Sequence, residues 1–218
     1  MSDLGNTVVA IDLDDTLYPE ADYRRSGIAA VSRRIRELYG RDIEPELQKA
    51  GENAEDVWGL ACRLLGAPVA VKEQFLWIYR LHAPDIALSA DTLETLDWLE
   101  AACRRIVIVT DGRSTSQRAK LMALGLSRHE AFISEETGSA KPDPARFETI
   151  MRAHPQSAFV YVADNPQKDF IAPKRLGWRT VGLRGSRRNI HSADDSRLPA
   201  SHRPHVWVDC FSDLRKVL

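Results

Sequence analysis

Short runs of β-branched and apolar residues alternate with amphipathic stretches along most of the chain, and this alternation limits the folds open to it. Six runs lack a helical period, as strands buried on both faces do. They are Thr7–Leu13, Arg105–Thr110, Ala131–Ser134, Ala158–Ala163, Thr180–Leu183 and Val206–Asp209. Because helices between strands produce parallel pairing through right-handed crossovers, the pattern predicts an α/β fold with a doubly wound parallel sheet.

Four amphipathic stretches follow individual strands or precede them, as the crossover helices of such a sheet would. They are Thr92–Ala102, Ser114–Leu124, Pro144–Ala153 and Lys168–Leu176. In the first, Leu93, Leu96 and Leu99 share one face. Glycines placed directly after the second and fourth are typical of helix C-termini.

One long segment between the first two strands interrupts the alternation. Three apolar stripes with helical spacing occur there, the first formed by Ile28, Val31, Ile35 and Leu38 and the third lying in Val71–Leu81. A single long crossover packed on the sheet is the alternative, but three or four helices are too many for one connection. We therefore predict a helical domain at 18–85 inserted into a core formed by 1–17 and 86–218.

Bulk properties restrict the class of protein and its partners. The chain has 218 residues and a formal net charge of −1, which gives no sign of a nucleic-acid partner. It shows neither an apolar run of about 20 residues nor a signal peptide. Cys62, Cys103 and Cys210 are scattered, so we expect reduced, buried thiols in a cytoplasmic protein with no membrane contact. The polar segment Arg184–Pro204 indicates a surface loop. The sequence gives no indication of the oligomeric state.

Three carboxylates stand where the first predicted strand ends. Asp12, Asp14 and Asp15 follow an apolar run, and buried charges of one sign need a counter-charge or a metal. Asp12 and Asp14 point to the same side if the strand continues. Open α/β sheets bind ligands at the carboxyl ends of their strands. The position therefore favours a functional role over packing.

Later strands end in residues that suit a phosphorylated ligand. Thr110 ends the second strand and precedes Asp111 and Gly112, so a hydroxyl and free backbone N–H groups stand at its tip. Lys141 lies in the segment Ser139–Pro144, whose two prolines hold the chain extended or turned around it, and a lysine held in place can neutralise a phosphate. The chain thus offers donors and a cation at the same edge as the acidic group.

The fourth strand again ends in carboxylates, Asp164 and Asp169. Carboxylate oxygens are hard ligands that suit Mg²⁺, which takes one or two of them together with water and substrate phosphate oxygens. We therefore expect Mg²⁺ as the cofactor.

With these four groups in order, the chain resembles the haloacid dehalogenase-like (HAD) hydrolase superfamily. The family's four motifs correspond here to Asp12–Leu17, Thr110–Gly112, Lys141, and Asp164 with Asp169. The resemblance extends from about Val8 to Leu183. In two places the chain departs from the commonest family pattern: Asp15 stands where many members have glycine, and Ala163 precedes Asp164 in place of glycine.

The resemblance implies a mechanism. Asp12 would attack phosphorus and form an aspartyl-phosphate, while Asp14 would protonate the leaving oxygen and later activate water. Thr110 and Lys141 would hold the phosphoryl oxygens. The metal would be held by Asp12, the backbone carbonyl of Asp14 and Asp164, and Asp169 would either join the metal shell or bind Lys141.

Three further residues complete the candidate phosphate-binding group. They are Asp111, Gly112 and Arg113, which follow the second strand; Gly112 would allow close backbone approach, and Arg113 would approach the leaving group.

The acid at position 14 separates two chemistries within the family. Dehalogenases lack it, because a halide leaves without a proton, so Asp14 indicates a phosphatase with a helical cap over its site. We expect a small phosphomonoester as substrate, either a sugar phosphate or a nucleotide. A phosphomutase of the same superfamily is the near alternative, and a non-catalytic binding protein on the same scaffold is the alternative of a different class.

Overall fold

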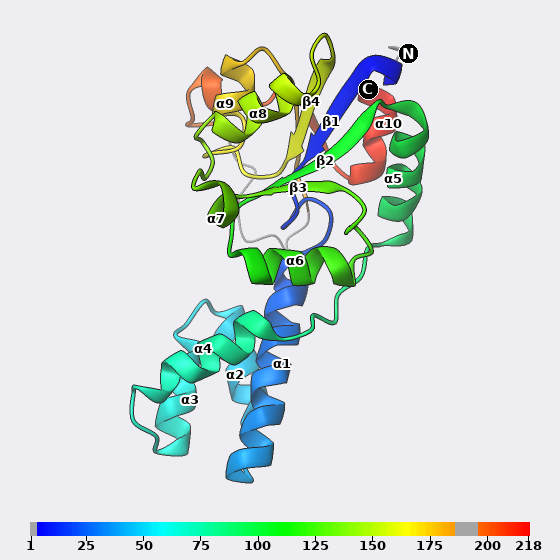
Figure 1. The fold of residues 1–218 in the computed structure, drawn as a ribbon. Helices are drawn as coiled ribbons and strands as arrows, with labels where there is room; N and C mark the ends of the chain where they lie inside the picture. The colour runs from blue at the N-terminus through cyan, green and yellow to red at the C-terminus, as the bar shows by residue number, and fades with distance from the viewer. Residues whose placement is uncertain (1–3, 186–195) are drawn as a thin grey trace.

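The computed structural model describes residues 4–185 and 196–218, which form a parallel six-stranded sheet with a helical insertion (Figure 1). The strand order is β3-β2-β1-β4-β5-β6. The strands are β1 (Thr7–Ile11), β2 (Arg105–Thr110), β3 (Glu130–Ile133), β4 (Ala158–Ala163), β5 (Arg179–Leu183) and β6 (Val206–Val208). The predicted α/β fold with a doubly wound parallel sheet is confirmed. Strands β2 and β4 have the predicted bounds, and those of the other four strands differ by one or two residues.

Strand β1 lies at the centre and is buried along its whole length. Its last residue, Ile11, is in register with Ile108 of β2 and Val162 of β4. The carboxyl ends of β1, β2 and β4 therefore reach the same edge of the sheet, which we call the carboxyl edge. Strand β1 pairs with β2 on one side and with β4 on the other, so the direction in which successive strands are added reverses at β1. Open α/β sheets bind ligands at such reversals.

Side chains that alternate along β1 enter two different cores. Val9 and Ile11 pack in a cluster with Leu96 of α5, whereas Val8 and Ala10 pack in a cluster on the opposite face. The helices of the core are α5 (Ala90–Ala102), α6 (Ser114–Ala123), α7 (Ser134–Thr137), α8 (Ala145–Ala153), α9 (Ile171–Arg175) and α10 (Leu214–Val217). Short 3₁₀ helices are η1 (Leu4–Asn6), η2 (Ala200–His202) and η3 (Phe211–Asp213).

The helical insertion consists of α1 (Glu20–Tyr39), α2 (Glu44–Glu52), α3 (Val57–Leu65) and α4 (Val71–Leu81). It projects from the carboxyl edge of the sheet, with α6 as the nearest core helix (Figure 1). It has a core of its own, in which Ile28, Val31 and Ile35 of α1 meet residues of the other three helices. This domain boundary stays a prediction, although the helices fall inside the predicted range 18–85.

Several details differ from the sequence-based expectations. Leu38 is 61% exposed and Leu93 46% exposed, although both were placed on buried stripes. Each lies near a helix end, where fewer neighbouring elements can cover a side chain. Helix α2 was not recognised as a separate apolar stripe. All three cysteines are free, as expected, but only Cys62 is buried. Cys103 is half-buried and Cys210 is exposed.

The segment at the end of β4 also differs from its prediction. Helix α9 begins at Ile171, not at Lys168, because Asn165 to Phe170 form turns in which Asn165 O accepts from Lys168 N and Asp169 N. Residues 186–195 of the loop predicted at 184–204 lie outside the described residues. Within the described ranges, no helix combines the length and apolar character needed to cross a membrane.

Candidate active site

Asp12 lies one residue beyond β1 and shares a buried lysine with Asp169. Lys141 Nζ lies 2.8 Å from Asp12 Oδ1, 2.8 Å from Asp169 Oδ1 and 3.0 Å from Tyr161 Oη. The side chains of Lys141 and Asp169 are about 1% and 0% exposed. Burial raises the pKa of Asp12 to about 6 against the opposing charge of Lys141, whereas the two carboxylates raise the pKa of Lys141 well above its usual value. Lys141 is therefore a permanent cation between two acids.

Asp164 adds a third buried acid. Carboxylate oxygens of Asp12, Asp164 and Asp169 all lie within 4.8 Å of one another. Asp164 Oδ2 is buried and has no hydrogen-bond partner in the described chain, and Oδ1 receives only a 3.5 Å contact from Thr16 Oγ1. Burial, followed by repulsion from Asp12 and Asp169, raises the pKa of Asp164 to about 8. One lysine does not balance three acids, so the residues present fit a bound divalent cation.

Asp14, two residues after Asp12, is bound by three donors. Lys120 Nζ lies 2.7 Å from Oδ1, Tyr18 Oη donates to Oδ1 at 2.5 Å, and Gln117 Nε2 donates to Oδ2 at 2.9 Å. Burial opposes ionisation of Asp14, but the charge and hydrogen bond of Lys120 outweigh it and hold the pKa of Asp14 below its usual value. The Asp14 carboxylate is therefore ionised and fully engaged in this structure.

Thr110 ends β2, and the side-chain amide of Gln117 links it to Asp14 through two hydrogen bonds. Gln117 Nε2 donates to Thr110 Oγ1 at 2.5 Å as well as to Asp14. Gly112, with φ of +151°, leaves room for this side chain, since a Cβ there would lie 3.0 Å from Gln117 Cδ. The space beside Gly112 thus holds Gln117, and the expected close approach of backbone to phosphate stays a prediction.

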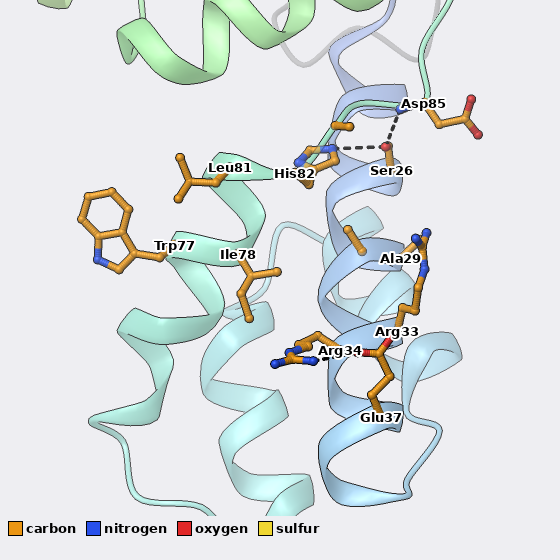
Figure 2. Close-up of a pocket in the computed structure, with 12 residues that line it drawn as sticks. Ser26, Ala29, Arg33, Arg34, Glu37, Trp77, Ile78, Leu81, His82 and Asp85 are labelled. Carbon is orange, nitrogen blue, oxygen red and sulfur yellow. Dashed lines mark hydrogen bonds and ion pairs between the residues drawn. The ribbon is translucent and has the colours of Figure 1, made fainter.

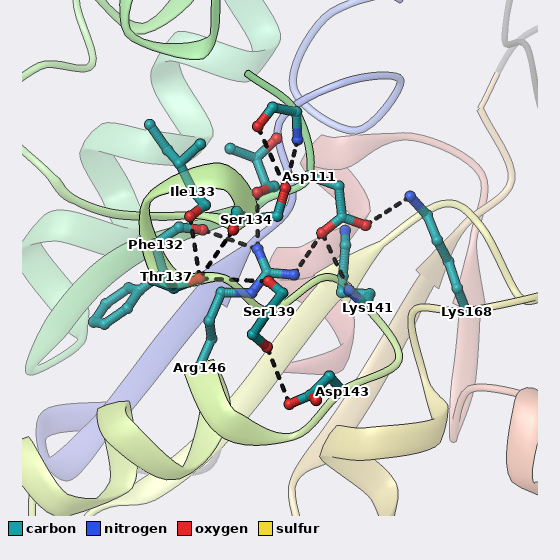
Figure 3. A network of polar contacts seen from close by, with 12 residues as sticks. Asp111, Phe132, Ile133, Ser134, Thr137, Ser139, Lys141, Asp143, Arg146 and Lys168 are labelled. Carbon is teal, nitrogen blue, oxygen red and sulfur yellow. Dashed lines mark hydrogen bonds and ion pairs between the residues drawn. The ribbon is translucent and has the colours of Figure 1, made fainter. Parts of the chain in front are cut away.

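Asp111 is the centre of a separate network of cations (Figure 3). Arg146 Nη2 lies 2.5 Å from Oδ1, Lys168 Nζ 2.9 Å from Oδ2, and Lys141 N donates to Oδ1 at 3.2 Å. Arg146 also donates to the backbone oxygens of Thr110 and Phe132, so it joins β2, β3 and α8. Despite burial, the charges of Lys141 and Lys168 lower the pKa of Asp111 to about 2. Asp111 therefore holds together Arg146, Lys168 and the backbone at Lys141, and its predicted place in the phosphate-binding group stays a prediction.

Arg113 was placed with the phosphate-binding residues, and the structure does not bring it to the site. Its guanidinium bonds Glu135 Oε1 at 2.9 Å, and its side chain is 54% exposed. Helix α6 begins at the next residue and directs Arg113 toward the start of α7, which explains why it pairs with Glu135. Arg113 is absent from the pocket lining given below.

Sequence reasoning missed four residues that hold the site together. They are Gln117, Lys120, Arg146 and Lys168. A signal existed for two of them, because residues 117 and 120 are three apart on a helix that follows Thr110 directly and so share one face. Nothing in the sequence indicated that Arg146 would be buried.

The carboxyl edge encloses a pocket of about 210 Å³ between the core and the start of α1. Its lining consists entirely of polar or charged residues. They are Asp12, Asp14, Asp15, Glu20, Thr110, Asp111, Asp164, Asn165 and Lys168. Burial and the charge of Asp14 raise the pKa of Glu20 to about 7. The pocket thus combines Asp12 and Asp164 of the acidic group, the Asp14 carboxylate and one residue from the helical insertion.

A larger cavity of about 590 Å³ lies on the helical insertion between α1 and α4 (Figure 2). Trp77 and Leu81 stand at its side, and Ser26 Oγ bonds both His82 Nε2 and Asp85 N at its upper end. This cavity contains none of the residues at the carboxyl edge, so its size does not make it the active site.

Comparison with known proteins agrees with this geometry. The model of the haloacid dehalogenase-like hydrolase family matches residues 7–177. A glyceraldehyde 3-phosphate phosphatase of Methanopyrus kandleri is 30% identical, over 95% of this chain and 98% of its own. A ribulose-1,5-bisphosphate 5-phosphatase of Halopiger xanaduensis is also 30% identical, over 95% and 97%.

A solved structure gives the same architecture. The crystal structure of a predicted phosphoglycolate phosphatase from Haemophilus somnus aligns with a TM-score of 0.63 at 21% identity, over 96% of each chain, which shows a shared fold. The chain thus belongs to the haloacid dehalogenase-like hydrolases and is a phosphoric monoester hydrolase of that family.

Proposed function

We propose that this enzyme is a Mg²⁺-dependent phosphatase that hydrolyses small sugar phosphates through an aspartyl-phosphate at Asp12. The observation that carries the proposal is the group of three buried carboxylates around Asp12, which one lysine does not neutralise. Such a group is costly unless it binds a cation, and a cation beside Asp12 makes that carboxylate able to approach an anionic substrate.

Asp12 is the proposed nucleophile. Lys141 fixes one of its oxygens, Oδ1, at 2.8 Å, so the other is available to attack phosphorus. Lys141 and the Thr110 hydroxyl then lie where they can stabilise the charge on the phosphoryl oxygens. Hydrolysis of the aspartyl-phosphate by water regenerates the Asp12 carboxylate and releases phosphate.

Asp14 is the proposed acid and base. In the structure it is ionised, held by Lys120, Tyr18 and Gln117. A substrate phosphate placed next to it adds negative charge, which raises the pKa of a neighbouring carboxyl and favours proton uptake. The protonated Asp14 gives its proton to the leaving oxygen, and the carboxylate then takes a proton from the attacking water.

The metal would be held by the carboxylates of Asp12 and Asp164 and by the backbone carbonyl of Asp14. When bound, Mg²⁺ supplies positive charge that offsets repulsion between the anionic nucleophile and the phosphate. Asp169 contacts Lys141 and also lies within the group, and its second oxygen accepts from Asn165 N at 2.9 Å. We therefore assign Asp169 to positioning Lys141 and the turn that carries Asp164.

The pocket favours a sugar phosphate over a nucleotide. Among its lining residues in the described chain there is no aromatic or aliphatic side chain on which a base could stack, whereas Glu20, Asp15 and Lys168 can bond hydroxyl groups. The two relatives at 30% identity are named for phosphorylated sugars of small size, which supports the same class. The helical insertion supplies Glu20 and would act as a lid that excludes water.

The test is hydrolysis of p-nitrophenyl phosphate and a panel of triose, pentose and hexose phosphates, with Mg²⁺ and with EDTA. We expect phosphate release that needs Mg²⁺ and is lost in Asp12→Asn. Asp42→Asn is the matched control, because Asp42 pairs with Arg36 on the exposed surface of the helical insertion and should leave activity unchanged. Equal rates for wild type and Asp12→Asn would refute the proposal.

A further inference from the structure

We infer that Lys120 and Gln117 of α6 are positioning residues for proton transfer, because they fix the Asp14 carboxylate and set the direction of the Thr110 hydroxyl. This inference rests on the proposed function, in which Asp14 is the acid for the leaving oxygen. Both residues come from the helix that follows β2, three positions apart, so they face the carboxyl edge together.

Lys120 is almost completely buried, with a side chain 4% exposed, and its ammonium has two partners from different parts of the chain. It lies 2.7 Å from Asp14 Oδ1 and 4.2 Å from the centre of the Tyr23 ring of α1. A buried lysine beside an aromatic face and a carboxylate is held in one place by both contacts. Because Tyr23 belongs to the helical insertion, the position of Asp14 depends on how that insertion packs on the core.

Gln117 uses both hydrogens of one amide nitrogen. Nε2 donates to Asp14 Oδ2 and to Thr110 Oγ1, whereas the reversed amide would place its oxygen against the carboxylate. Since Nε2 only donates, the Thr110 hydroxyl must accept there, and its own hydrogen is left to donate. Gln117 therefore sets Thr110 as a donor toward a phosphoryl oxygen while it holds the second oxygen of Asp14.

A purely structural ion pair would not require this arrangement. Asp14 receives donors from two side chains of α6 and from Tyr18, which precedes α1, and both of its oxygens are fixed, although the side chain remains 18% exposed and lines the pocket. Hydrogen bonds to both oxygens fix the orientation of the Asp14 carboxylate, while its exposed part still faces the pocket. This orientation matters because a proton donor must lie within hydrogen-bond reach of its acceptor.

The test compares phosphate esters with good and poor leaving groups. Departure of an alkoxide needs a proton, whereas departure of 2,4-dinitrophenolate does not, so misplacing Asp14 should affect only the first. For Lys120→Met with Mg²⁺, we expect kcat/KM on an alkyl phosphate to fall about 100-fold or more, and that on 2,4-dinitrophenyl phosphate to fall less than about tenfold. Gln117→Leu also releases the Thr110 hydroxyl, so it should lower kcat/KM on both substrates, with a fall at least about tenfold larger on the alkyl phosphate. Lys120→Arg, which keeps the charge, should recover part of the loss.

Met122→Ala is the matched control, because Met122 is on the same helix and is 69% exposed; its activity should equal that of wild type. Thermal unfolding establishes that each variant is folded, and Gln117→Leu tests the inference even where Lys120→Met does not fold. An equal fall on both substrates, or no fall, would overturn the inference while wild-type hydrolysis stands. Absence of hydrolysis by wild type would instead overturn the proposed function.

Discussion

Replacing Asp164 by asparagine should stabilise the metal-free enzyme and abolish its activity. Asp164 has a buried oxygen without a hydrogen-bond partner, and no lysine or arginine in the described ranges forms an ion pair with it. Asparagine has nearly the same shape and removes one negative charge from a group of three. The gain in stability and the loss of function therefore have a single cause. It is the negative charge of Asp164, which is costly to bury unless a cation is bound.

The magnitude follows from the pKa of Asp164, which burial and the neighbouring carboxylates raise from 3.8 to about 8. One unit of pKa corresponds to about 1.4 kcal/mol. The raised pKa of Asp164 therefore lowers the free energy of unfolding at neutral pH by a few kcal/mol. Because the folded pKa lies above the unfolded one, the protonated form favours folding. Its contribution is complete below about pH 3.8 and is lost as pH rises through about 8.

Urea unfolding in EDTA between pH 6 and 8.5 measures this effect. We expect wild-type stability to fall more steeply with rising pH than that of Asp164→Asn, with the variant more stable at pH 8. Added Mg²⁺ should raise the wild-type melting temperature and change that of the variant much less. Asp209→Asn, an exposed acid, is the control and should follow wild type. A variant less stable than wild type at pH 8 in EDTA would refute this reasoning.

Three further substitutions test other parts of the structure. Lys141→Met leaves two buried carboxylates without their cation and should lower the free energy of unfolding by about 3–5 kcal/mol in urea; a change below about 1 kcal/mol would contradict it. Asp14→Asn should lower kcat by about 10²- to 10⁴-fold while the Mg²⁺-induced rise in melting temperature remains, so unchanged turnover would exclude its role as acid and base. Gly27→Ala places a Cβ in overlap with the Tyr79 ring and should cost about 1–3 kcal/mol, measured by thermal unfolding, because the ring or helix α4 must shift.

The sequence was sufficient for the fold because strands buried on both faces leave an unambiguous pattern. Residues 105–110 and 158–163 were located with their bounds unchanged, since both are uninterrupted β-branched or aromatic runs. The strand order was not available from the same pattern, because periodicity reports which face is buried and says nothing of which strand is the neighbour. The helices of the insertion were located from apolar stripes with helical spacing. Leu38 shows, however, that such a stripe can extend past the elements that pack on it.

The site divides in a similar way. Asp12, Thr110, Lys141 and Asp164 were identifiable because each stands where an apolar strand or a proline-bounded loop ends, and the sheet then brings them together. The spacing of Gln117 and Lys120 indicated a shared helix face, but it did not indicate that this face is buried, because a lysine on an amphipathic helix is normally on its solvent face. The burial of Lys120 depends on contact with Tyr23 of the helical insertion, and such long-range packing leaves no local signal.

The cations of the site are assigned to particular acids, and this assignment explains which acid is left for a metal. Lys120 bonds Asp14, Arg146 and Lys168 bond Asp111, and Lys141 bridges Asp12 and Asp169. Asp14 and Asp111 consequently have lowered pKa values, whereas Asp12 and Asp164 have raised ones. Neutralised acids can orient other groups, but only an under-compensated pair attracts a divalent ion. The unequal distribution of positive charge therefore distinguishes Asp14, the proposed acid and base, from Asp12 and Asp164, the proposed metal ligands, within one pocket.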